Sequence, residues 1–204
     1  MTDIRILIVE DEPLIAEDIA ETLQNIGYHV AGVAYSSDKA LDLLAIRQPD
    51  LALLDINIKG PQNGIDLGRI IHEKYKIPFL FLTSYGDRGV IDEAKKTMPY
   101  GYVLKPFSEA ELLGALEVAL YRFAHENKPG KTPDLEVVNK HALEPLSPRE
   151  YEVLCDLCTG LNNKQIAEKQ FVSENTIKTH VRQILAKLDA PNRSSAMHKV
   201  AGMR

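Results

Sequence analysis

The sequence predicts an α/β fold, a doubly wound five-stranded parallel sheet, followed by a small all-α domain of four helices. Over the first 125 residues, short apolar runs alternate five times with segments of helical spacing. A stretch rich in proline, glycine and charge follows. Four short helices with capping signals are predicted in the rest of the chain. The total charge of −5 hides an asymmetry, since residues 1–125 carry a net −7 and residues 160–204 a net +5.

The five predicted strands are apolar throughout, as is typical of a parallel sheet covered by helices on both faces. They are Ile4–Val9, Val30–Ala34, Leu51–Leu54, Pro78–Leu82 and Tyr102–Leu104, the third closing on Asp55. The helices between them are predicted at Pro13–Ile26, Ser37–Arg47, from the loop holding Gly64 to about Tyr75, Asp87–Thr97 and Ser108–Phe123. Gly27 and Pro49 end the first two helices, and a capping box begins the fifth at Ser108. Right-handed crossovers between the strands then give a three-layer sandwich.

The composition places a boundary after this domain. We expect a sheet domain over residues 1–124, a linker over residues 125–145 and a helical domain over residues 146–204, because the middle segment holds Pro129, Gly130, Pro133 and Pro145 among many charges. The helical domain begins with a capping box at Ser147-Pro148-Arg149-Glu150. Its other helices are predicted at Asn163–Phe171, at Glu174–Leu188 behind the cap residue Ser173, and from Asn192 or Ser194 to Gly202.

Several classes of protein are excluded by simple counts. The chain contains no run approaching the ~18 apolar residues of a membrane span, and its N-terminus lacks the layout of a signal peptide. Its two cysteines, Cys155 and Cys158, are too few for a disulfide scaffold. We therefore expect a soluble cytoplasmic protein with no membrane partner.

Polar residues cluster where the predicted strands end. Glu10 and Asp11 follow the first strand, Asp55 closes the third, Thr83 follows the fourth and Lys105 follows the fifth. Because these strand ends meet at one edge of the sheet, we expect the side chains to lie together. Three adjacent carboxylates repel one another, and a hard divalent cation such as Mg²⁺ relieves that repulsion. A carboxylate nucleophile, a metal site, an ammonium and a hydroxyl together favour phosphoryl transfer.

These stretches resemble the receiver domain of two-component response regulators, the CheY-like fold. The resemblance covers about residues 3–123 and rests on Val9-Glu10-Asp11-Glu12-Pro13, Leu53-Leu54-Asp55, Leu82-Thr83-Ser84 and Tyr102-Val103-Leu104-Lys105-Pro106-Phe107. It implies that Asp55 accepts a phosphoryl group from a phosphohistidine of a sensor histidine kinase. It also implies that Mg²⁺ binds Asp11 directly, Glu10 through water, Asp55, and the backbone carbonyl of Asn57. Lys105 would pair with the phosphoryl oxygens, and the peptide bond before Pro106 would be cis.

The same resemblance implies a switch. On phosphorylation the Thr83 hydroxyl would move to a phosphoryl oxygen, and Tyr102 would rotate inward into the vacated space. The loop after Asp55 departs from the family pattern. Lys59 stands where a proline is usual, Pro61 comes late, and the loop over residues 56–63 is one residue longer.

The second and third helices of the C-terminal domain, with the tight turn between them, suit a helix-turn-helix. On the second of this pair an apolar stripe, Ile177, Val181, Ile184, Leu185 and Leu188, predicts the buried face. Lys178, Arg182 and Lys187 face away from the stripe, and Thr179 lies beside Lys178. Lys164 and Asn163, at the start of the supporting helix, could bind phosphate through side chain and backbone N–H.

This segment resembles the LuxR-type helix-turn-helix of the NarL/FixJ group. The matching stretches are Leu146-Ser147-Pro148-Arg149-Glu150, Val153-Leu154, Gly160-Leu161-Asn162-Asn163-Lys164-Gln165-Ile166-Ala167, Val172-Ser173-Glu174-Asn175-Thr176-Ile177-Lys178-Thr179-His180-Val181 and Ile184-Leu185-Lys187-Leu188. The resemblance implies that Lys178, Thr179 and Arg182 read bases, that Thr176 and Lys187 help hold the DNA backbone, and that the last helix can dimerise. It predicts a phosphorylation-dependent transcription regulator that binds double-stranded promoter DNA as a homodimer, with RNA polymerase as a candidate partner. The chain is then not an enzyme beyond its own phosphorylation and slow dephosphorylation.

Other interpretations remain at this point. A hydrolase with an aspartyl-phosphate intermediate would need a second acid two positions after the nucleophile, where Asn57 stands. A sigma-factor-like promoter module would need polymerase-binding regions, and a receiver that binds only a protein partner would not need the basic tail. The sequence Cys155-Asp156-Leu157-Cys158 could be a redox or zinc motif, but its place within an amphipathic helix favours core packing.

Overall fold

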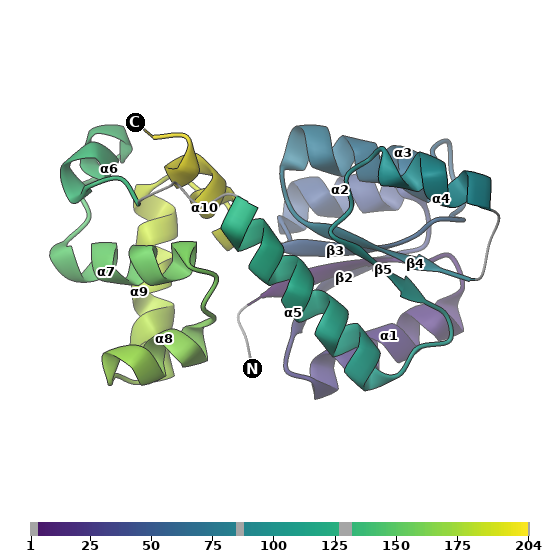
Figure 1. The fold of residues 1–204 in the computed structure, drawn as a ribbon, viewed down its shortest axis with the longest axis horizontal. Coiled ribbons are helices and arrows are strands. Elements are labelled where there is room, and N and C mark those ends of the chain that lie inside the picture. The colour runs from purple at the N-terminus through teal and green to yellow at the C-terminus, as the bar shows by residue number, and fades with distance from the viewer. Residues whose placement is uncertain (1–3, 85–87, 127–131, 204) are drawn as a thin grey trace. The chain divides into compact units, whose positions relative to one another are not determined.

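The computed structural model describes residues 4–84, 88–126 and 132–203. It divides the chain into two compact units, one ending at Leu120 and the other beginning at Tyr121. We call them the sheet unit and the helical unit (Figure 1).

The sheet unit contains five parallel strands in the order β2-β1-β3-β4-β5. Their bounds are β1 Arg5–Val9, β2 His29–Ala34, β3 Leu51–Asp55, β4 Phe79–Thr83 and β5 Gly101–Leu104. The chain moves outward from β1 to β2 and then crosses to the other side of β1 to form β3. The predicted fold class is thus confirmed, and the carboxyl ends of β1 and β3 flank the switch point where ligands bind in such sheets.

Helices cover both faces of this sheet, as the apolar strands predict (Figure 1). One buried cluster joins the sheet to α1 (Pro13–Asn25) and α5 (Glu109–Glu126). A second joins the opposite face to α2 (Ser37–Arg47), α3 (Gly64–Ile70) and α4 (Arg88–Lys95). A five-residue π-helical segment, Ile71–Tyr75, continues α3. Both faces of the sheet are therefore buried under apolar side chains, and polar functional groups can gather only at the strand ends.

Capping residues fix where several of these helices begin. Ser36, not the predicted Ser37, caps α2 by accepting a hydrogen bond from the Lys39 N–H. Before α5, the predicted capping box is present: the Ser108 N–H donates to the Glu111 carboxylate, and the Glu111 N–H donates back to the Ser108 hydroxyl. The predicted first residue of the fourth helix, Asp87, lies outside the described residues, and α4 ends at Lys95, before the predicted Thr97.

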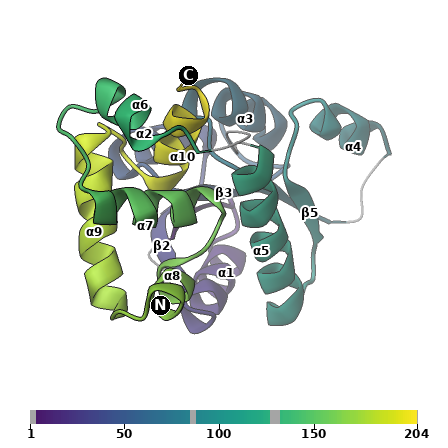
Figure 2. The same cartoon turned by 60° about the vertical axis from the view of Figure 1, so that its left-hand side comes forward.

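The helical unit holds α6 (Leu135–His141), α7 (Pro148–Cys158), α8 (Asn163–Gln170), α9 (Glu174–Lys187) and α10 (Arg193–Ala201), and α9 packs against α7 and α8 (Figure 2). Four of these five helices match the prediction. The fifth, α6, lies within the stretch that we predicted as a linker, and it buries Val138 completely. The stretch predicted as a linker therefore contains a helix that the sequence analysis did not predict.

Within the described part of the chain, no helix combines the length and apolar character that crossing a membrane requires.

Candidate functional site

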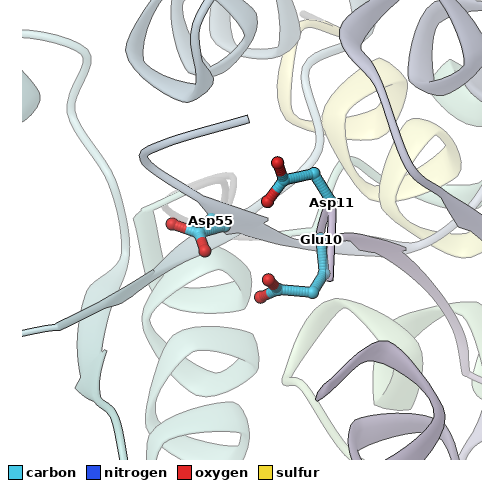
Figure 3. A group of neighbouring side chains, drawn as sticks. All are labelled: Glu10, Asp11 and Asp55. Carbon is cyan, nitrogen blue, oxygen red and sulfur yellow. The ribbon is translucent and has the colours of Figure 1, made fainter. Parts of the chain in front are cut away.

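Three carboxylates meet at the carboxyl ends of β1 and β3. Glu10 and Asp11 leave β1, and Asp55 is the last residue of β3. Each offers an oxygen within 4.8 Å of the other two (Figure 3). Glu10 is fully buried, and the Asp55 side chain is 13% exposed. The structure thus brings together the acidic residues that the sequence analysis placed at one sheet edge.

Lys105 joins two of these carboxylates. Its Nζ donates a hydrogen bond to Asp55 Oδ2 at 2.5 Å and another to Glu10 Oε2. The lysine follows β5, with its N–H bonded to the Thr83 carbonyl, and the peptide bond to Pro106 is cis as expected. Because the Lys105 side chain is only 12% exposed, water screens its two ion pairs weakly.

The titration of these groups follows from burial and pairing. Burial raises the pKa of the Glu10 carboxyl above its usual value, and the hydrogen bond from Lys105 offsets that effect only in part. Burial lowers the pKa of the Lys105 ammonium, but the hydrogen bonds to Asp55 and Glu10 outweigh it, so the pKa is raised. The site therefore keeps its lysine charged and leaves buried negative charge that one ammonium does not fully offset.

The two predicted switch residues lie near the site. The Thr83 side chain is nearly buried, and its hydroxyl donates to the Ser84 carbonyl at 2.9 Å. Tyr102 packs against Phe81 with ring centroids 5.8 Å apart. The Tyr102 hydroxyl is buried without a hydrogen-bond partner among the described residues, and burial raises the pKa of the phenol. In this structure the ring thus places its hydroxyl inside the protein.

The loop after β3 is held by close backbone contacts. The Asn57 N–H donates to Asp55 Oδ1 at 2.9 Å and orients the carboxylate. At Gly64, the first residue of α3, a Cβ atom would lie 2.0 Å from the Asp55 carbonyl oxygen. At Gly60, with φ of +128°, a Cβ would lie 2.2 Å from the Ser37 hydroxyl. Both positions therefore need glycine, which explains the loop's glycines by sterics.

A second lysine at the site was not predicted. The Nζ of Lys59 lies 3.3 Å from Asp11 Oδ2, and the Lys59 side chain is 75% exposed. The sequence analysis noted this residue only as a departure from the family pattern. Its position four residues after Asp55, in the same loop, is the signal that could have placed it near the carboxylates.

The donor set fits a hard divalent cation. Glu10, Asp11 and Asp55, here called the trio, all offer carboxylate oxygens. Mg²⁺ is usually bound through one or two carboxylates together with water and phosphate oxygens. Lys105 bonds only Glu10 and Asp55, so one ammonium faces three neighbouring carboxylates. A cation bound between Asp11 and Asp55 would relieve that excess of negative charge.

The helical unit presents the predicted recognition helix with its apolar stripe inward. Ile177, Val181, Ile184 and Leu188 are buried, and Leu185 is half-buried. The second capping box of the unit, at Asn162 and Gln165, begins α8, and Ser173 caps α9 by accepting from the Thr176 N–H. The turn between them closes at Phe171, which has φ of 54° and is 96% exposed. The predicted helix-turn-helix pair is therefore present.

The polar residues predicted to contact DNA fall into two groups. Arg182, Lys164, Thr176 and Thr179 are exposed. Lys178 is half-buried beside Glu174, with Nζ 3.3 Å from Oε1, and the Thr179 hydroxyl donates to the Asn175 carbonyl. These residues remain predicted contacts.

Asn163 and Lys187 behave differently. The Asn163 side chain is buried, with Oδ1 3.5 Å from an Arg193 guanidinium nitrogen, so any contact with DNA would have to come from its backbone. Lys187 donates to Glu150 Oε2 at 2.8 Å and to the Pro145 carbonyl at 3.1 Å. Lys187 therefore has partners within the helical unit, and its contact with the DNA backbone stays a prediction.

Cys155 and Cys158 lie on the side of α7 that faces the core. Cys158 is buried, and burial raises the pKa of its thiol to about 12. Cys155 is half-buried, and both are free cysteines. A thiol with so high a pKa is a poor nucleophile and metal ligand, which agrees with the packing interpretation.

Comparison with protein families now distinguishes the alternatives. Residues 6–117 match the model of the response regulator receiver domain, and residues 144–200 match the bacterial regulatory proteins of the luxR family. The chain belongs to the two-component response regulators. It combines a receiver with a LuxR-type helix-turn-helix, so it is a regulator of transcription rather than a hydrolase or a sigma factor. From here on, the sheet unit is called the receiver.

Relatives that match nearly the whole chain and relatives that match only part of it both support this assignment. The chain is 30% identical over 210 residues to the transcriptional regulatory protein LnrK of Bacillus subtilis, covering 95% of this chain and 94% of that protein. It is equally identical to the transcriptional regulatory protein LiaR of the same organism, at 95% and 94% coverage. It is 36% identical over 119 residues to PdtaR of Mycobacterium tuberculosis, where the match spans 58% of each protein. The response regulator thus shares its full two-part plan with some relatives and one part with others.

Solved structures of receiver domains support the assignment of the sheet unit as a receiver. The signal receiver domain of a modulated diguanylate cyclase from Desulfovibrio desulfuricans is 31% identical, with a TM-score of 0.56, and the match covers 59% of this chain and 96% of that one. The BeF3-activated receiver domain of RstA from Klebsiella pneumoniae is 30% identical, with a TM-score of 0.53 and coverage of 56% and 97%.

Proposed function

We propose that this response regulator controls promoter binding through phosphorylation of Asp55 by a sensor histidine kinase. The observation that carries the proposal is the group of three carboxylates within 4.8 Å of one another, with Lys105 bonded to two of them. A structural role alone would not explain this arrangement, because burying Glu10 beside two other carboxylates costs stability.

The proposed reaction moves one phosphoryl group. An oxygen of the Asp55 carboxylate bonds to the phosphorus, the bond between phosphorus and the histidine nitrogen of the kinase breaks, and the imidazole leaves after taking up a proton. Lys105, already 2.5 Å from Asp55 Oδ2, stabilises the charge that collects on the phosphoryl oxygens. When bound, Mg²⁺ would be held by Asp11, Asp55, the carbonyl of Asn57 and, through water, Glu10, and would neutralise the same charge.

The transmitted change begins at Thr83. Its hydroxyl now bonds to the Ser84 carbonyl, and phosphorylation supplies acceptor oxygens that attract it instead. The Tyr102 hydroxyl is buried in this structure, and the moved Thr83 hydroxyl leaves room for the ring in this inward position. The altered surface around β5 then favours a homodimer, whose paired α9 helices bind two half-sites of promoter DNA.

A labelling experiment tests the first step. Acetyl phosphate with Mg²⁺ should add one phosphoryl group to the wild-type chain, seen by intact mass spectrometry and released by hydroxylamine, which cleaves acyl phosphates. The label should be absent in Asp55→Asn and unchanged in Asp92→Asn, which removes an exposed carboxylate on α4. Labelling that survives Asp55→Asn would contradict the proposed site.

A binding experiment tests the second step. Selection of DNA from a random pool, with and without beryllofluoride, should enrich a sequence with two half-sites, and more strongly with beryllofluoride. Retention of DNA without any sequence preference would contradict promoter recognition by the helical unit.

A further inference from the structure

The β3–α3 loop places the ammonium of Lys59 against the carboxylates at the strand ends, and hydrogen bonds to a neighbouring helix hold the backbone of this loop. The Lys59 carbonyl accepts a hydrogen bond from the Ser37 N–H at 3.0 Å, and the Gln62 N–H donates to the Ser37 hydroxyl at 3.3 Å. Ser37 is fully buried in the first turn of α2. The loop therefore has a fixed anchor on a neighbouring helix.

Gly60 makes this anchor tight. A side chain there would meet the Ser37 hydroxyl at 2.2 Å, and its φ of +128° suits glycine alone. The backbone of Lys59, next to Gly60, is thereby fixed in position. Its side chain takes no part in the anchor and extends to Asp11, where Nζ lies 3.3 Å from Oδ2.

The two lysines contact different parts of the trio. Lys105 bonds to Glu10 and Asp55, whereas Lys59 contacts Asp11, which Lys105 does not contact among the described residues. The contact of Lys59 is also the more labile of the two, because its side chain is 75% exposed and that of Lys105 is 12% exposed. Lys59 can leave Asp11 at the small cost of an exposed ion pair.

We propose that Lys59 competes with Mg²⁺ for Asp11 and thereby sets the magnesium concentration at which the receiver is loaded. The proposal rests on the proposed function, since it concerns the same metal site. A dication at Asp11 would repel the Lys59 ammonium, and Lys59, being 75% exposed, can withdraw into water, which the 12% exposed Lys105 cannot do. Its removal should therefore strengthen Mg²⁺ binding, even though Lys59 itself makes no bond to the metal.

The test measures Mg²⁺ binding directly. In Lys59→Gln, isothermal titration calorimetry should give a Mg²⁺ dissociation constant about two- to fivefold lower than in the wild type, the range expected for one exposed ion pair. The Mg²⁺ concentration for half-maximal labelling by acetyl phosphate should fall by the same factor. Lys59→Arg, which keeps the charge, should stay close to the wild type.

Lys95→Gln provides the matched control. It removes an exposed lysine of α4 that pairs with Asp92, so the net charge changes equally at a different place. An unchanged or higher dissociation constant in Lys59→Gln would overturn the proposal, and so would a shift of equal size in Lys95→Gln or in Lys59→Arg. If the wild type bound no Mg²⁺ and Asp11→Asn behaved identically, the proposed function itself would fail instead.

Discussion

Burial makes the charged residues of the receiver depend on one another. Glu10 is fully enclosed and its pKa is raised, so its charge is tolerated mainly through the ammonium of Lys105. The same ammonium holds Asp55, the proposed phosphoacceptor. One side chain therefore links the carboxylate that would react with the carboxylate that would help bind the metal.

Lys105→Ala should separate phosphorylation from its consequences. The variant should still be labelled by acetyl phosphate, because Asp55 and the metal ligands remain, but it should not dimerise in response, because the phosphoryl group lacks the ammonium that positions it. Analytical ultracentrifugation with and without beryllofluoride measures the response. A normal shift in sedimentation would refute the role of Lys105, and circular dichroism confirms that the variant is folded.

Arg182 is the residue of α9 most suited to base recognition, because it is exposed and faces away from the buried stripe. If it pairs bidentately with a base, Arg182→Ala should cost about 1–3 kcal/mol of DNA-binding free energy and relax the preference at one base position. Lys164→Ala should weaken all sequences similarly and reduce the salt dependence by about one charge. Titrations on matched and mutated sites distinguish the two; equal losses on every sequence would make Arg182 a phosphate contact.

Sequence reasoning succeeded where local chemistry decides the outcome. The five apolar strands and their order along the chain predicted the sheet, and therefore the meeting of Glu10, Asp11 and Asp55. The capping boxes at Ser108 and Ser147 also follow from residues three positions apart. Such features need no knowledge of distant contacts.

The failures concern contacts that the sequence does not display. Helix α6 has seven residues and follows Pro133, so it shows too little periodicity to stand out from a linker. The hydrogen bond from Lys187 to Glu150 was not predicted, because the two residues lie 37 positions apart in the chain. The position of Lys59 four residues after Asp55 could have placed it near the carboxylates, but its contact with Asp11 depends on a loop bonded to Ser37, which spacing alone does not predict.

The start of α7 gives a test at the scale of one element. Glu150 Oε2 accepts hydrogen bonds from the Ser147 N–H at 2.6 Å and from Lys187 at 2.8 Å. Burial raises the pKa of this carboxyl, but the hydrogen bonds from Lys187 and Ser147 outweigh it, so the pKa lies below its usual 4.5. The ionised carboxylate therefore stabilises the helical unit above pH 4.5, and this stabilisation is lost as the pH falls through the lowered pKa.

Glu150→Gln should accordingly destabilise the helical unit by about 1–2 kcal/mol near neutral pH, because a charged hydrogen bond is replaced by a neutral one. Hydrogen exchange of the α7 amides measures the loss. The difference from the wild type should shrink below pH 4.5, whereas Glu152→Gln, which removes an exposed partner of Arg149, should change little at either pH. A loss independent of pH would show that the charge of Glu150 is not the cause.

At the scale of the molecule, the two units divide the work by charge. Residues 1–120 carry 11 basic and 19 acidic side chains, a net −8 that suits a site that loads a cation, and residues 121–204 carry 13 basic and 10 acidic, a net +3 that suits a polyanion. Phosphorylation at one unit can change DNA binding at the other only if the two events bias a common equilibrium. The unphosphorylated regulator should then retain weak binding to the same promoter site.

Such coupling is reciprocal, and this gives a strict test. If beryllofluoride tightens binding to the selected DNA site by some factor, typically about 5- to 150-fold for linked sites, that DNA must tighten beryllofluoride binding by the same factor. Fluorescence anisotropy of labelled DNA measures the first effect, and calorimetric titration of beryllofluoride with and without DNA measures the second. Asp55→Asn should abolish both effects while leaving the basal DNA affinity unchanged. Two unequal factors, or an effect that persists in Asp55→Asn, would show that the receiver does not control DNA binding through the proposed site.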